Sequence, residues 1–120
     1  MSRKFALEKK TEQNTAYRKV IQTTKQMQLV LMCLPPNDFI KKERHGHTTQ
    51  FLRVEEGEIQ VDLEGSKKIL REGDSLMIPP KMWHSVQNKG KEPAHLYTLY
   101  APPEHPADLV QLVNPDCGCE

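Results

Sequence analysis

The chain has 120 residues, which is enough for one domain with a single hydrophobic core and excludes a second catalytic domain. Seventeen basic residues against sixteen acidic ones give a formal net charge of +1, and the basic residues are scattered rather than gathered in a stripe. This balance implies neither a nucleic-acid partner nor an anionic membrane.

The cellular location is also constrained by the sequence. No apolar run reaches the roughly 18 residues of a transmembrane helix, and residues 1–6 lack the apolar stretch of a signal peptide. Three cysteines, an odd number, are not typical of a disulfide framework. We therefore expect a cytoplasmic protein with reduced thiols and no membrane contact.

The first 14 residues are polar and charged and show no sustained periodicity. They favour a loose arm or a short helix over a core element, and residues 1–14 are assigned to a flexible N-terminal arm. Strand-like composition then begins at residues 17–21 and 28–34. The second segment is apolar on both faces, which predicts a place between two layers or at a subunit contact.

Further short strands are expected as far as residue 100. Apolar and polar residues alternate in several of them, and glycine and proline mark the turns between them. About eight short strands with no amphipathic helix predict an antiparallel barrel or jelly roll. The segments that follow residues 28–34 are residues 50–55, 59–63, 67–70, 75–78, 83–86 and 94–100.

Side chains suited to a divalent metal lie in two stretches, residues 43–51 and 73–84. Carboxylate, imidazole and amide groups together make a good set of ligands for a borderline cation. Residues two apart on a strand face the same side, so Glu43 and His45 can point into a barrel together. Gln50 can join them after the intervening turn, and His84 would come from another strand.

Residues 15–107 resemble a small single-domain cupin. The second motif of that family, G(X)5PXG(X)2H(X)3N, matches Gly73, Pro79, His84 and Asn88, with Lys81 where glycine is usual. The resemblance implies an all-β fold, an antiparallel jelly-roll barrel with short irregular extensions at both ends.

The first cupin motif, G(X)5HXH(X)3-4E(X)6G, is degenerate in this chain, so its register has to be argued. If His45 and His47 were its two histidines, the acidic position would fall on Phe51 or Leu52, and neither side chain binds metal. That register fails.

Counting back from Gly57 places Gln50 at the acidic position, His45 at the second histidine and Glu43 at the first. Every position then holds a competent ligand. With the ending at residues 96–105, this pattern resembles a subgroup of small cupins described as similar to mannose-6-phosphate isomerases. The resemblance implies one divalent metal ion, and zinc, manganese, iron, nickel and cobalt all suit the donors.

Four residues are candidates for a general acid or base: His47, Tyr97, Tyr100 and His105. The two tyrosines lie on opposite faces of one strand, so at most one can line the barrel. His47 has no place in the motif register and could instead be a solvent-facing turn residue. His105 could reach the barrel mouth or belong to an exit loop.

Two functional classes remain open from the sequence. One is a metal-dependent isomerase or dioxygenase acting on a small polar metabolite such as a sugar, keto acid or dicarboxylate. The other is a non-catalytic sensor or storage barrel that binds a small molecule or metal. A homodimer is expected in either case, with residues 28–34 at or near the shared sheet.

The last segment, residues 108–120, is the least family-like part of the chain. Its Cys117 and Cys119 supply only half of a tetrahedral metal site. Cys33 is expected to be a buried small hydrophobic residue.

Overall fold

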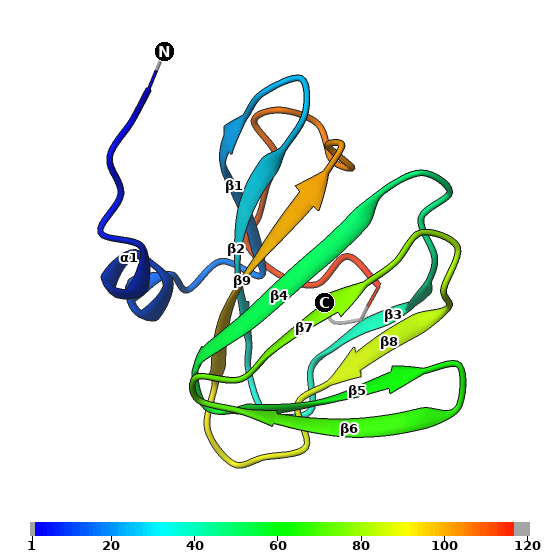
Figure 1. Ribbon diagram of the computed structural model, residues 1–120. Coiled ribbons are helices and arrows are strands. Elements are labelled where there is room, and N and C mark those ends of the chain that lie inside the picture. Colours follow the sequence, from blue (N-terminus) through cyan, green and yellow to red (C-terminus); the bar gives the residue numbers. More distant parts are fainter. Residues whose placement is uncertain (1, 117–120) are drawn as a thin grey trace.

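Two antiparallel sheets face each other in the computed structural model, which describes residues 2–116 (Figure 1). The six-stranded sheet has the order β10-β1-β2-β9-β4-β7, and the four-stranded sheet has the order β3-β8-β5-β6. This arrangement confirms the predicted jelly roll. In chain order the elements are α1 (Leu7–Gln13), β1 (Arg18–Thr23), β2 (Gln28–Leu34), β3 (Phe39–Glu43), β4 (Thr49–Glu56), β5 (Glu58–Leu63), β6 (Ser66–Arg71), β7 (Ser75–Ile78), β8 (His84–Gln87), β9 (Ala94–Ala101) and β10 (Val110–Gln111).

The sequence analysis did not predict β3 and β10. In β3 only Phe39 and Ile40 are apolar, so the alternation is too brief to stand out, and the strand pairs only with β8 at a sheet edge. The β10 strand has two residues and exists because Val110 and Gln111 pair with the start of β1. Both elements depend on long-range pairing rather than on a local pattern.

The N-terminal segment forms α1, which contacts β9 and β4 of the six-stranded sheet. Asn14 ends the helix, and its carbonyl oxygen lies 3.1 Å from Nδ1 of His95 on β9. Residues 10, 13 and 14 border a surface hollow together with Leu31, and β2 is buried along its whole length within a single chain. No helix within the described residues has the length and apolar character needed to span a bilayer.

The core between the sheets changes from apolar to polar toward one end. Val30, Leu52 and Leu96 are fully buried in its apolar part. At the polar end, Gln28 and Gln50 pair with Tyr100 from either side, so three polar side chains stand in one interior row across β2, β9 and β4. The functional side chains described below gather at this end.

Candidate metal centre

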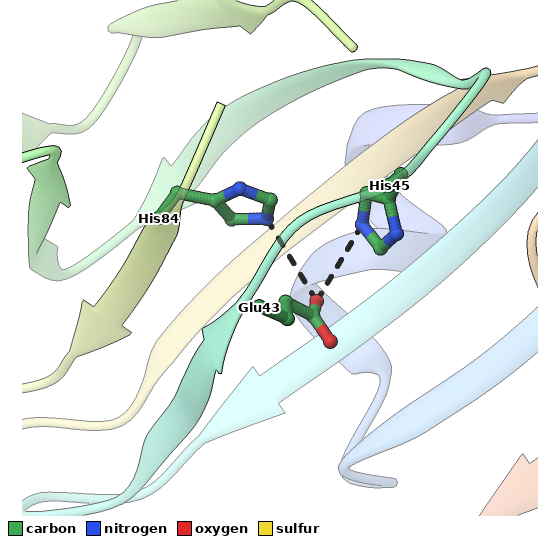
Figure 2. Close-up of side chains that lie close together, drawn as sticks. All are labelled: Glu43, His45 and His84. Atoms are coloured by element: carbon green, nitrogen blue, oxygen red, sulfur yellow. Dashed lines mark ion pairs between the residues drawn. The ribbon is translucent and has the colours of Figure 1, made fainter. Parts of the chain in front are cut away.

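The end of β3 and the start of β8 bring Glu43, His45 and His84 together. Glu43 pairs with His84 across the two strands after a bulge, and His45 follows two residues later. The Oε1 atom of Glu43 lies 3.6 Å from Nε2 of His45 and 3.8 Å from Nε2 of His84. Figure 2 shows the carboxylate between the two rings. One ligand atom from each residue lies within 4.8 Å of the others, so this cluster could hold a metal ion.

In both imidazoles Nδ1 has a polar partner outside the cluster, and Nε2 is the nitrogen that faces Glu43. Nδ1 of His84 lies 3.0 Å from the carbonyl oxygen of Met82, and Nδ1 of His45 lies 3.2 Å from Oε1 of Glu104. These oxygens can only accept, so each Nδ1 donates, and in a neutral imidazole Nε2 is then the atom with the lone pair. Both Nε2 atoms are buried and have no hydrogen-bond partner within residues 2–116. The donor set therefore fits a divalent cation, and the carboxylate behind His45 is the usual outer support of such a ligand.

The charges in the cluster keep Glu43 ionised. Burial acts to raise the pKa of Glu43, but contact with His84 and the charges around it lower the pKa overall. Burial acts to lower the pKa of His84, and contact with Glu43 outweighs this and raises it. A carboxylate is therefore present at neutral pH, as a cation ligand must be.

Tyr100 connects Gln50 on β4 to this cluster. The Nε2 atom of Gln50 donates to the hydroxyl of Tyr100 at 3.4 Å, and the ring of Tyr100 meets the ring of His45 edge-on at 5.8 Å. The amide oxygen of Gln50 is buried and has no hydrogen-bond partner in the part of the chain that the structure describes. That oxygen can accept a hydrogen bond or bind a cation.

A buried glutamine holds the loop that supplies Glu104. The Gln28 side chain accepts hydrogen bonds from the backbone N–H groups of Glu104 and His105, at 3.2 and 2.9 Å, and donates to the carbonyl oxygen of His105 at 2.8 Å. Gln28 is completely buried. It therefore fixes the backbone from which Glu104 reaches His45, and the sequence analysis singled out neither Gln28 nor Glu104.

The backbone of Lys81 holds the backbone carbonyl group of His45. The φ of Lys81 is 71° and lies in the left-handed region, at the position where the cupin motif has glycine. The Lys81 N–H donates to the carbonyl oxygen of His45 at 2.7 Å. The departure from the motif therefore changes the residue type while the backbone keeps the conformation that glycine favours.

The four acid–base candidates divide into two pairs. Tyr100 and His105 face the interior, with their rings edge-on at 5.0 Å. Burial raises the pKa of Tyr100 to about 12 and lowers the pKa of His105 to about 4, so both are neutral at pH 7. His47 is exposed, and Tyr97 lies on the outer face opposite Arg53, so neither joins the cluster.

The cysteines do not contribute to this centre in the part of the chain that the structure describes. Cys33 is buried and free, as expected. Cys117 and Cys119 lie outside the described residues, and the proposed boundaries at residues 14 and 107 stay predictions.

Comparison with known proteins defines the family. Residues 30–100 match the model of the Cupin domain, and the chain belongs to the cupin family. Cupins often bind metals and small molecules, in keeping with the cluster at Glu43.

Two relatives match most of the chain. The L612 protein of Acanthamoeba polyphaga mimivirus is 37% identical over 90% of this chain and 70% of its own length. The YrkC protein of Bacillus subtilis is 36% identical over 88% of this chain, which spans 60% of YrkC. Among solved structures, BH2720 from Bacillus halodurans has a TM-score of 0.91 at 33% identity, covering 93% of this chain and 89% of that one.

Proposed function

We propose that this protein is a metal-dependent cupin enzyme that acts on a small polar metabolite, with Glu43, His45, Gln50 and His84 holding one divalent ion. The observation that carries the proposal is a pair of buried imidazoles beside the Glu43 carboxylate. Their Nε2 atoms have no hydrogen-bond partner among the described residues. When bound, the ion would supply Lewis-acid polarisation of a substrate oxygen.

The residues around the cluster have distinct roles in this proposal. Glu104 and the Met82 carbonyl orient the two imidazoles. His105 is neutral and its buried Nε2 has no partner, so it can take up a proton from a bound molecule. Tyr100 keeps its proton and can donate a hydrogen bond. Isomerase and dioxygenase chemistry both remain compatible with these groups, and zinc, manganese, iron, nickel and cobalt all suit the ligands.

One observation favours the alternative of a non-catalytic sensor. The pKa values of His105 and Tyr100, about 4 and about 12, are both far from neutral, whereas an efficient acid–base catalyst has a pKa near the working pH. The same barrel would then bind a metal or small molecule without turnover.

Turnover separates the two functions. Metal-loaded protein is incubated with hexoses, 2-oxo acids and dicarboxylates and followed by NMR, beside His84→Ala and His105→Gln. If the protein is an enzyme, we expect product with wild type and none with His84→Ala. His105→Gln should keep its metal and lose product formation. Ligand-induced stabilisation with no product from any compound would support the sensor instead.

A homodimer in the cytoplasm is part of the proposal. The outer face of the six-stranded sheet carries an apolar row formed by Leu29, Leu99, Phe51 and Met77, which are neighbours in register across β2, β9, β4 and β7. Met77 is 63% exposed in one chain, and a second copy would cover it. Light scattering should show a dimer that Phe51→Glu dissociates, and a monomeric wild type would contradict this assembly.

A further inference from the structure

Arg18 is a buried cation at the start of β1. It is 7% exposed, and it faces the interior because its cross-strand neighbour Met32 belongs to the core. Its Nη1 atom donates to Oε1 of Gln111 at 2.6 Å, while its Nε atom is buried without a hydrogen-bond partner. Within residues 2–116, no carboxylate forms an ion pair with Arg18.

This burial is energetically unfavourable unless an anion is supplied. A guanidinium offers five N–H donors in a fixed fork, and a charge taken out of water needs an opposite charge to offset its lost hydration. The ring of Tyr17, 5.1 Å from Cζ of Arg18, offers a partial compensation. Among residues 2–116, one neutral amide and one aromatic face leave most of this demand unmet.

Arg18 also faces the same interior as the metal cluster. Burial is the largest cause acting on the pKa values of Glu43, Tyr100 and His105, and the positive charge of Arg18 acts on each of the three as well. Arg18 is therefore close enough for its charge to act on all three of these groups.

We propose that Arg18 binds the carboxylate of the molecule on which the metal centre acts, so that the ligand is a small organic acid anion and not a neutral sugar. This inference rests on the proposed function and narrows its substrate class. A carboxylate matches the planar fork of a guanidinium with two parallel hydrogen bonds.

The test compares wild type with Arg18→Met, Arg18→Lys and Lys19→Gln. Lys19 is the neighbouring exposed cation on β1 and serves as the control. Pyruvate is the carboxylate probe, with glucose and inorganic phosphate beside it, and binding is followed by calorimetry and thermal melting with and without Zn²⁺. We expect pyruvate to bind wild type and Lys19→Gln alike, and at least about thirtyfold more weakly to Arg18→Met, because a buried charged partner is lost. Arg18→Lys should fall between them because it keeps the charge without the fork.

Two further readouts separate binding from a structural role. Ligand-free Arg18→Met should melt at or above the temperature of wild type, because an unpaired buried charge has been removed. Its Zn²⁺ content should match wild type. A lower melting temperature with unchanged pyruvate binding, or a preference of wild type for phosphate or glucose, would overturn the inference. A wild type that does not bind Zn²⁺ would instead contradict the proposed function. Pyruvate binding to the metal-free protein would still test the role of Arg18 in that case.

Discussion

The contact between Glu104 and His45 gives a prediction that separates metal affinity from fold stability. The Glu104 carboxylate lies 3.2 Å from Nδ1 of His45, and its side chain is 33% exposed. A partly exposed carboxylate–imidazole contact contributes at most about 1 kcal/mol to folding, so Glu104→Gln should change the free energy of unfolding by less than that. Loss of the outer support of a metal-binding imidazole lowers metal affinity by about 10- to 100-fold.

The glutamine and alanine variants should therefore form a graded series. Glu104→Gln keeps an acceptor without its charge and should weaken Zn²⁺ binding by about tenfold, which corresponds to about 1.4 kcal/mol. Glu104→Ala loses the acceptor as well and should approach a hundredfold loss. Competition against a fluorescent chelator measures both, with Asp108→Asn, an exposed carboxylate in the same loop, as the control. Affinities of both Glu104 variants within about twofold of wild type would refute the reasoning.

Two further predictions concern stability. A Cβ atom on Gly57, which has a φ of 85°, would lie 2.7 Å from the Pro93 carbonyl oxygen, so Gly57→Ala should lower the free energy of unfolding by about 2 kcal/mol or more. Gly65→Ala, with a φ of 93° and no atom within 4 Å, should cost only about 1 kcal/mol in urea unfolding, and equal losses would contradict the role of the close approach. The lowered pKa of His105, about 4 against 6.5, means that the unfolded state binds the proton first as the pH falls through this window. The metal-free protein should therefore lose stability from pH 6.5 to pH 4, and His105→Phe should flatten this loss in thermal melts; parallel curves would count against a buried neutral His105.

The strands that could be predicted from sequence are those with a local signal. In β5, Ile59 and Val61 alternate with polar residues, and this period follows directly from the geometry of a strand. The two-residue β10 carries no such signal, because its existence depends on pairing with Arg18 and Lys19 far away in the sequence. The apolar character of β2 on both faces indicated a strand buried on both sides, and β2 is buried at every position within a single chain.

The same distinction applies to the site. The two motifs brought Glu43, His45, Gln50 and His84 into one hypothesis. The structure places the side chains of Glu43, His45 and His84 in one cluster. The roles of Gln28 and Arg18 could not be predicted from the sequence. A polar or charged residue beside an apolar strand is normally expected at the surface, and only the fold shows that these two are buried. Their roles depend on which distant loop or strand lies opposite each of them, and that information is not local.

Metal content is the most direct test of the central claim. The protein is purified without chelator or nickel affinity resin and analysed for metals, beside His45→Ala and His84→Ala and with the exposed His47→Ala as the control. We expect about one equivalent of a single divalent metal in wild type and His47→Ala, and little in the other two variants. A wild type without metal, and without thermal stabilisation by added zinc, manganese, iron, cobalt or nickel, would contradict it.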